Sequence, residues 1–223
     1  MDPSPIWLSI KLAAITTLIL LLAGLPLAWW LSKKRSLFKI IIEAIITMPL
    51  VLPPSVLGFY LLLMFSPQHG VGLWLQQTFN VQFVFSFPGL VIASVIYSMP
   101  FMISPVKSAF QQLPASLSQA SYTLGKTQWQ TLWHVLLPNI KPSLLTAAVL
   151  TFAHTLGEFG VVLMIGGNIP GVTRVASIAV YDSVEQMNYT AANNYSLILF
   201  AITFAMVLSV FIYNKYQAKS PLE

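Results

Sequence analysis

Long apolar stretches separated by short polar segments make up most of this chain. Five runs are predominantly apolar over about 20 residues or more: 6–31, 40–66, 88–106, 143–166 and 195–214. A bilayer core of ~30 Å is crossed by roughly 20 helical residues at 1.5 Å each. The pattern therefore predicts an all-α, polytopic integral membrane protein with about five transmembrane helices.

Composition supports a membrane environment, since 57% of the 223 residues are hydrophobic and only 8% are charged. A soluble chain would carry roughly a quarter of its residues as charges. No linker separates a soluble domain, so residues 1–223 are expected to form one transmembrane domain. Cysteine is absent, which excludes disulfides, thiolate metal sites and cysteine nucleophiles.

The basic residues indicate how the chain lies in the membrane. The net charge of +5 comes from short clusters beside the spans, which argues against a nucleic-acid partner. Nine of the eleven Lys and Arg residues follow the first span, follow the third span or end the chain, and two lie toward the other side. Cytoplasmic connections are rich in Lys and Arg. We therefore expect an external N-terminus, a cytoplasmic C-terminus, and external connections at 67–87 and 167–194.

The second span contains three prolines, Pro49, Pro53 and Pro54. Each removes a helical hydrogen bond, so this span is expected to kink or break. The kink is interpreted either as purely structural or as a hinge beside a translocation path, and both interpretations stay open.

One connection has an amphipathic helical pattern. Apolar residues recur at nearly helical spacing through 119–138, and polar residues lie between them. Gly125 is expected to end one short helix and begin a turn, and Pro114 and Pro138 bound the pair. Such a pair of helices could be gripped by another protein, or could lie on the membrane surface without a partner.

The spacing in this connection resembles the EAA loop of bacterial ABC importer permeases. That pattern is EAA, three residues, G, nine residues, I-x-L-P, and here the matching positions are Gln119, Ala120, Ser121, Gly125, Val135, Leu137 and Pro138. Gln119, Ser121 and Val135 depart from the usual Glu, Ala and Ile, which removes any ion pair at the first position. The resemblance implies a type I importer fold with a cytoplasmic coupling loop at 107–142.

Two further segments, 48–58 and 152–185, resemble the molybdate permease branch, and sulfate/thiosulfate permeases carry related segments. The resemblance implies a homodimeric path for molybdate or tungstate in a bacterial inner membrane, working by alternating access. It also implies two copies of a cytoplasmic ABC ATPase, which bind ATP and Mg²⁺, and a periplasmic oxyanion-binding protein. No cofactor on this chain and no enzymatic reaction are expected. A sulfate/thiosulfate importer is the alternative.

Polar residues within the spans are candidates for the path. Hydroxyls and backbone amides bind an anion weakly enough to release it, and the candidates are Ser55, Ser98, Thr151 and Thr155. Glu158 and His154 are expected to lie on one polar stripe of the fourth span with the two threonines. Because a carboxylate repels a dianion, Glu158 is assigned a structural or gating role, paired with backbone amides or with a cation such as Arg174 or Lys11.

Other interpretations of these residues are weaker. His154 and Glu158 stand four residues apart, as in half of a zinc site, but no third ligand lies within helical reach, so no metal site is expected. Glu43 is expected to pair at the membrane interface near Lys39. A membrane metalloenzyme and a non-transporting assembly subunit remain as remote alternatives to a permease.

Overall fold

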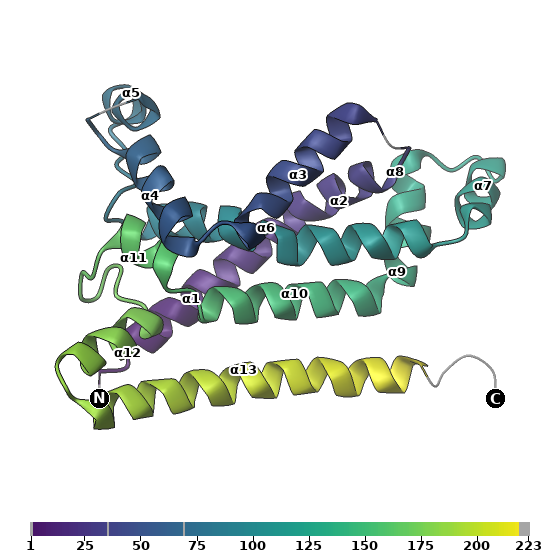
Figure 1. Cartoon of the computed structure of the whole chain (residues 1–223). Coiled ribbons are helices and arrows are strands. Elements are labelled where there is room, and N and C mark those ends of the chain that lie inside the picture. The colour runs from purple at the N-terminus through teal and green to yellow at the C-terminus, as the bar shows by residue number, and fades with distance from the viewer. Residues whose placement is uncertain (1, 35, 69, 219–223) are drawn as a thin grey trace.

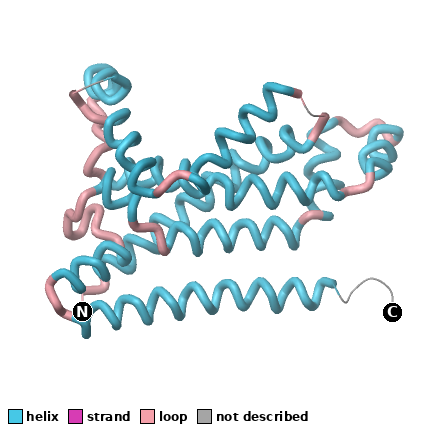
Figure 2. The backbone as a smooth tube through the Cα atoms, in the orientation of Figure 1, coloured by secondary structure: helices cyan, strands magenta, loops and turns pink. Residues whose placement is uncertain are grey.

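Helices form nearly all of the structure, a computed structural model that describes residues 2–34, 36–68 and 70–218 (Figures 1 and 2). No strand occurs in those ranges. Three helical stretches are long and apolar enough to cross a membrane, or up to five if each of two sharply bent helix pairs is one span. The predicted all-α fold with about five spans is therefore confirmed.

The first span is one helical rod with a local widening. It comprises α1 (Ser4–Ile19), the π-turn η1 (Leu20–Gly24) and α2 (Leu25–Ser32). Pro26 is the second residue after the π-turn. Since a proline ring clashes with the carbonyl four residues earlier, the wider turn lets the helix continue through this position.

The second span breaks where two prolines are adjacent. α3 (Leu37–Val51) and α4 (Pro54–Phe65) differ in direction by 117°. Leu52 and Pro53 between them have extended ψ angles of 138° and 135°, as residues before a proline prefer. The predicted break is confirmed at Pro53–Pro54, whereas Pro49 stays inside α3.

The third span, α6 (Phe87–Gln112), is the central helix and extends beyond its predicted end at residue 106. It packs against α1, α2, α3, α10 and α11. Lys107 therefore belongs to this helix rather than to a connection. Pro100 and Pro105 lie inside α6 without ending it.

Residues 143–166 were predicted to form the fourth span as a single helix, and this prediction was wrong. α10 (Lys141–Leu156) ends at Gly157, and α11 (Gly160–Gly166) follows after Glu158 and Phe159. α11 packs against α4 and α6 instead of extending α10. Glu158 therefore does not continue the polar stripe of α10.

The connections contain helices that hydrophobic runs did not predict. α5 (Gly70–Phe79) lies in the first predicted external connection and α12 (Ala176–Glu185) in the second. The segment between α6 and α10 contains α7 (Ala115–Thr123), α8 (Gln128–Thr131), the π-turn η2 (Leu132–Leu136) and α9 (Leu137–Asn139). The predicted coupling loop, 107–142, thus includes the end of α6 and the start of α10.

Two clusters of buried apolar side chains hold the helices together. One joins α2, α3 and the second half of α6 to η2 and α10, and it includes Met102 and Leu132. The other joins α1, α4 and the first half of α6 to α11 and α12, and it includes Leu12 and Ile165. The first cluster fixes the coupling loop against the spans.

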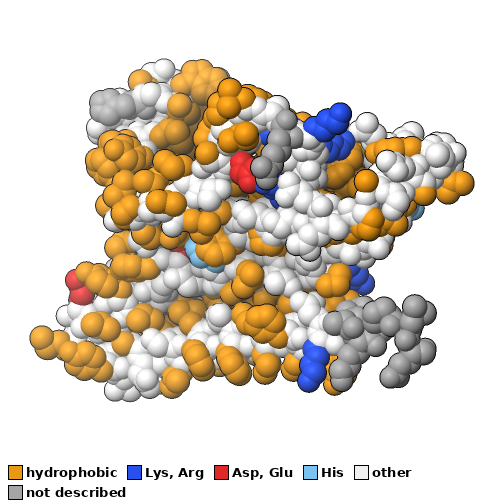
Figure 3. All heavy atoms as spheres, turned by 45° about the vertical axis from the view of Figure 1, so that its right-hand side comes forward, with side chains coloured by type: hydrophobic (Ala, Val, Ile, Leu, Met, Phe, Trp, Pro, Cys, Tyr) orange, Lys and Arg blue, Asp and Glu red, His pale blue; other side chains and the backbone are white. Residues whose placement is uncertain are grey.

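The last helix, α13 (Tyr189–Ala218), lies beside α10 and packs loosely (Figure 1). Only 6% of its most apolar window is buried within the chain. Two polar contacts fix its ends: the Tyr195 hydroxyl donates to the Asp2 carbonyl at 2.8 Å, and Asn214 Nδ2 donates to Thr146 Oγ1 at 2.8 Å. On the face shown in Figure 3, apolar side chains cover the helices, and Lys and Arg gather toward the coupling-loop end.

Candidate functional site

The coupling loop folds as two short helical units around Gly125. α7 begins after Pro114 and ends at Thr123, and α8 begins with Thr127 as its N-cap. The Thr127 hydroxyl accepts from the Gln130 amide, and the Gln130 side chain accepts from the Thr127 amide, which forms a capping box. The predicted helix–turn–helix is therefore present.

Gly125 has a backbone conformation that side chains disfavour. Its φ is +75°, and an added Cβ would meet nothing within 4 Å inside this chain. The Gly125 amide donates to the Tyr122 carbonyl and the Lys126 amide to the Ser121 carbonyl, a Schellman ending of α7. The glycine is thus required within the chain by its left-handed conformation rather than by close packing.

Polar and aromatic contacts fix the loop to the first span. The Ser121 and Thr131 hydroxyls are buried and lie 2.9 Å apart, which joins α7 to α8. Lys33 Nζ donates to Gln128 Oε1 at 2.9 Å and lies 3.7 Å from the centre of the Trp29 ring. Trp29 in turn packs on Trp129 with ring centroids 5.6 Å apart. Lys33 and Trp29 were not predicted, because nothing in a local pattern links them to a loop about 95 residues later.

The outer surface of the loop consists of polar side chains with a few large apolar side chains between them. Gln119, Ala120 and Pro138 are exposed, Val135 and Leu137 are partly buried, and Ser121 is buried. Leu124, Trp129 and Trp133 are large, apolar and more than half exposed, at 78%, 57% and 53%. The EAA-like positions therefore divide between an exposed surface and contacts that hold the loop in place.

A cavity of about 600 Å³ lies where α4 begins and where the chain turns from α10 to α11. It is lined by Pro54, Ser55, Tyr97, Ala153, His154, Gly157, Glu158, Phe159 and Gly160. The two helix breaks touch here, since a Cβ on Gly160 would lie 2.9 Å from Pro54 Cβ and 3.2 Å from the Ser55 nitrogen. Tyr97 was not predicted at this site, because its position on α6 follows no sequence motif.

Glu158 is buried beside this cavity, with 4% of its surface exposed. Neither carboxyl oxygen has a hydrogen-bond partner among the residues that the structure describes. The Ser94 hydroxyl is the polar group that lies beside this carboxyl. The expected cationic partners are engaged elsewhere: Arg174 contacts Asp182, and Lys11 lies over the Phe87 ring. The predicted pairing with Arg174 or Lys11 was therefore wrong.

The other path candidates separate into two groups. Ser55 lines the cavity. Ser98, Thr151 and Thr155 are buried between helices, where Ser98 Oγ lies 2.9 Å from Thr155 Oγ1 and Thr151 donates to the Ala147 carbonyl. Ser98 also contacts His154 Nδ1 at 3.0 Å. In this conformation Thr151 and Thr155 donate to carbonyls of their own helix, Ser98 bonds across to α10, and Ser55 alone of the four lines the cavity.

Glu43 has a different partner from the one expected. Its carboxylate forms an ion pair with Lys107 of α6, not with Lys39, whose ammonium donates to the Trp30 carbonyl. The Lys107 side chain is only 11% exposed, and that of Glu43 is 46% exposed. The pair joins the middle of α3 to α6.

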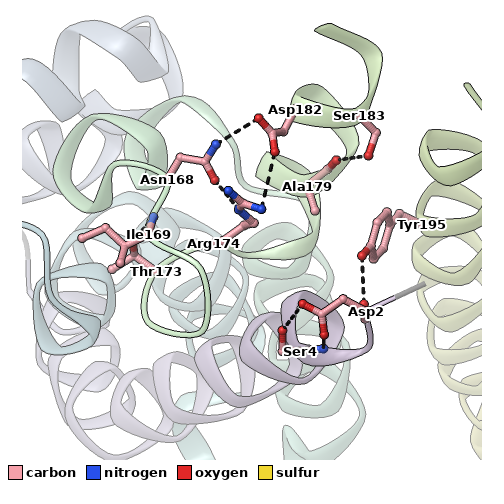
Figure 4. Close-up of polar contacts among 10 residues, drawn as sticks. All are labelled: Asp2, Ser4, Asn168, Ile169, Thr173, Arg174, Ala179, Asp182, Ser183 and Tyr195. Carbon is pink, nitrogen blue, oxygen red and sulfur yellow. Dashed lines mark hydrogen bonds and ion pairs between the residues drawn. The ribbon is translucent and has the colours of Figure 1, made fainter. Parts of the chain in front are cut away.

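At the end of the molecule opposite the coupling loop, polar contacts order the connection before α12 (Figure 4). Arg174 Nε donates to Asn168 Oδ1 at 2.5 Å, and its guanidinium lies 3.5 Å from Asp182. Asn168 also donates to Asp182 at 3.2 Å. This cluster holds the turn at 168–171, where Gly171 has φ +74°.

Comparison with known proteins assigns the chain to a family. The family model of the binding-protein-dependent transport system inner membrane component matches residues 14–220. The chain belongs to this family. No group of three or more possible metal ligands occurs among the described residues, and the homologues are transport permeases rather than enzymes.

Several relatives of this family are similar over most of their length. The molybdenum transport system permease protein ModB of Azotobacter vinelandii is 42% identical over 217 residues, 97% of this chain and 96% of that protein. ModB of Haemophilus influenzae is 32% identical over 222 residues, 98% and 96% of the two chains. The sulfate transport system permease protein CysT of Escherichia coli is 31% identical over 187 residues, 84% of this chain and 67% of that protein.

Solved structures share the fold at low sequence identity. A chain of the inward-facing MetNI methionine ABC transporter aligns with TM-score 0.73 at 18% identity, covering 95% of this chain and 94% of that one. A chain of a bacterial alginate ABC transporter, in complex with an alginate-bound periplasmic protein, gives TM-score 0.77 at 17% identity, covering 98% and 80%. The fold is therefore that of ABC importer permeases.

Proposed function

We propose that this chain is the membrane-spanning subunit of an ABC importer for molybdate, with tungstate as a second substrate. The observation that carries this proposal is the similarity to the Azotobacter molybdenum permease over nearly the whole of both chains. The sulfate relative is longer, and the match covers 67% of it. A sulfate/thiosulfate importer is the second candidate, favoured by that 31% identity.

The working unit in this proposal is a homodimer with two ATPase subunits and a periplasmic oxyanion-binding protein. Two protomers related by a twofold axis can enclose a path on that axis. One protomer of about five spans has too few helices to enclose such a path well. ATP and Mg²⁺ bind the ATPase, and this chain holds neither. Among the solved neighbours, the alginate transporter is a complex with a periplasmic protein, which supports a delivering partner here.

The coupling loop transmits movement to the spans. The exposed side chains Leu124, Trp129 and Trp133 supply an apolar contact for the ATPase. Leu132 and Leu136 beneath them are buried in the same cluster as Met102 of α6. Because η2 packs into that core, displacement of the loop moves α6 and α10 with it. This movement is the proposed basis of alternating access.

Transport by a reconstituted complex tests the substrate. Proteoliposomes containing this chain and its ATPase, supplied with the binding protein, are expected to take up labelled molybdate only when ATP is present. The matched control is an ATPase subunit that binds ATP without hydrolysing it. Uptake of sulfate but not of molybdate would show that sulfate is the substrate and would contradict the assignment to molybdate.

The proposed orientation places α12 outside and the coupling loop inside the cell. Because the chain has no cysteine, single cysteines report position without background from this subunit. A Thr190→Cys variant should react with a membrane-impermeant thiol reagent in intact spheroplasts, whereas Lys126→Cys should react only after permeabilisation. The reverse pattern would contradict the orientation and the docking of a cytoplasmic ATPase.

A further inference from the structure

A pocket of about 480 Å³ lies between the end of the first span and the coupling loop. Its walls come from the ends of α2 and α6, from α7, and from the start of α8 with η2. The exposed side chains assigned to the ATPase contact, Leu124, Trp129 and Trp133, do not line it. The pocket is therefore a separate surface of the coupling loop, for which the proposed function gives no ligand.

The pocket lies at the level where the first span ends. The span runs to Ser32, and Trp29 and Trp30 lie in its last turn. Tryptophans at the end of a span mark the headgroup region of the bilayer, and lysines just beyond it extend their ammonium groups into that region. Lys33 and Lys34 follow Ser32 directly and both line the pocket. We therefore place the pocket at the height of the lipid headgroups.

The charge of the pocket wall is positive and unbalanced. No Asp or Glu lines it, and the coupling loop, 107–142, contains none. Neither of the two ion pairs among the described residues involves Lys33 or Lys34. Burial lowers the pKa of the Lys33 ammonium, and the positive charge of Lys39 lowers it further. An anion bound in the pocket would offset both effects.

Hydrogen-bond donors reach the pocket from two elements. The Lys33 ammonium donates to Gln128 Oε1 at 2.9 Å and lies 3.7 Å from the centre of the Trp29 ring, which fixes its position. An ammonium group has three N–H donors, so donors remain for a ligand. Ser118 and Tyr122 line the pocket from α7, and their hydroxyls make no hydrogen bond with other described residues. The wall thus combines ammonium groups from the first span with hydroxyls from the coupling loop.

We infer that this pocket binds the phosphate group of an acidic phospholipid, which receives hydrogen bonds from the Lys33 and Lys34 ammonium groups and from the hydroxyls of α7. The inference goes beyond the proposed function and does not depend on which oxyanion is transported.

A lipid fits the pocket better than a soluble anion does. Part of the wall is apolar, with Trp29, Phe110 and Leu113, and suits the glycerol backbone and the first acyl carbons. Basic pockets beside spans at the cytoplasmic surface, where the proposed orientation places this one, are typical sites for acidic headgroups. The bound lipid would join the end of the first span to α7 and so hold the coupling loop against the membrane.

Protection of a single cysteine tests whether a lipid occupies the pocket. Ala115 lines it and is exposed, so Ala115→Cys is the reporter, and Lys126→Cys, exposed on the same loop outside the pocket, is the control. The complex with its ATPase, in a neutral detergent without nucleotide, is treated with an uncharged thiol reagent. Because the chain has no cysteine, the mass of this subunit reports modification of that one thiol.

Four additives are compared in this assay. They are a short-chain phosphatidylglycerol, the phosphatidylcholine with the same acyl chains, inorganic phosphate and molybdate. Phosphatidylglycerol at millimolar concentration should slow modification of Ala115→Cys at least about threefold, as expected once most sites are occupied. The other three additives should not slow it, and Lys126→Cys should react at the same rate throughout.

Variants of the two lysines test which groups hold the headgroup. In the Ala115→Cys background, Lys33→Gln with Lys34→Gln should abolish protection, whereas Lys33→Arg with Lys34→Arg should retain it. Lys126→Gln is the matched control, since it removes one charge from the same loop outside the pocket. Copurification with the ATPase shows that each variant has folded and assembled. Lys34→Gln alone, at an exposed position, should weaken protection even if the double variant fails to assemble.

Several outcomes would overturn the inference. They are equal protection by the two lipids, protection by phosphate or molybdate but not by lipid, equal slowing at Lys126→Cys, and full protection after both lysines are changed to glutamine. An Ala115→Cys thiol that reacts only after the ATPase is removed would assign the pocket to the ATPase instead. Molybdate uptake by the wild type alongside any of these results leaves the proposed function standing.

Discussion

The hydroxyl of Ser121 lies 2.9 Å from that of Thr131, and this buried contact closes the turn at Gly125. Thr131 also donates to the Thr127 carbonyl at 2.9 Å, so Ser121 is the donor to Thr131. The contact links the two helices on which the EAA-like positions lie. Three elements of the loop are therefore rigid relative to one another: α7, the turn and α8.

Removing this contact should loosen the loop without unfolding the chain. Ser121→Ala is expected to cost about 1 kcal/mol, the typical net contribution of one hydrogen bond. Thr131→Val removes a second bond as well and should cost more. The two changes share a partner, so the double variant should lose less than the sum of the single losses. Thermal unfolding in detergent measures these differences, and strict additivity would contradict the coupling.

A side chain at Gly125 should weaken coupling to the ATPase. The left-handed conformation at φ +75° costs a residue other than glycine ~1–2 kcal/mol. Gly125→Val should therefore distort the loop and reduce both copurification of the ATPase and ATP-driven uptake. Gly125→Asn should be milder, because asparagine tolerates this conformation better.

Lys126→Ala is the matched control for the glycine variants, since it leaves the backbone conformation accessible. Its uptake should stay within about twofold of wild type, as expected for an exposed surface position. ATP-driven uptake by Gly125→Val at the wild-type rate would refute the role given to this turn.

Breaking the Glu43–Lys107 pair should destabilise the joint between α3 and α6. Glu43→Gln leaves the Lys107 ammonium, whose side chain is 11% exposed, without its carboxylate, at a cost of roughly 1–3 kcal/mol. The double change Glu43→Gln with Lys107→Met removes the buried charge and should recover part of this loss. Thermal unfolding of the single and double variants checks this, and a double variant less stable than either single would count against it.

Close packing of α4 on α11 should make Gly58 intolerant of substitution. An added Cβ would lie 2.8 Å from Met164 Cβ and 3.1 Å from the Val161 Cα, so Gly58→Val should cost about 1–3 kcal/mol by overpacking. Gly24→Ala is the control, since its Cβ would make ordinary contacts at 3.4 and 3.5 Å with Met102 and Ile103. Equal melting temperatures for the two variants would contradict this packing.

Hydrophobic runs predicted the spans because roughly 20 apolar residues have only one stable placement in a bilayer. The break at Pro53–Pro54 was also predictable, since the missing N–H groups are a local property of proline. The end of α10 at Gly157 was not, because residues 160–166 are as apolar as a continuing helix. Their separation from α10 depends on packing against α4.

Among the candidate functional residues, those defined by local spacing were predictable from the sequence, and those defined by tertiary contacts were not. Gly125 and its neighbours were recognisable because their spacing within one segment determines the turn. The partner of Glu43 is 64 residues away on α6, and Tyr97 reaches the cavity through tertiary packing. Neither relationship leaves a periodic signal in the sequence. The burial of Glu158 likewise follows from the end of α10 at Gly157, which no local pattern predicted.

The 117° bend between α3 and α4 leaves non-helical backbone, at Leu52 and Pro53, in the middle of the apolar run 40–66. Hydrocarbon cannot hydrogen-bond the carbonyls that such a bend releases, so irregular backbone persists there only against protein or water. The outer side of this corner therefore cannot face acyl chains in the assembled transporter. It has to be solvated by an aqueous lumen or shielded by a neighbouring polypeptide.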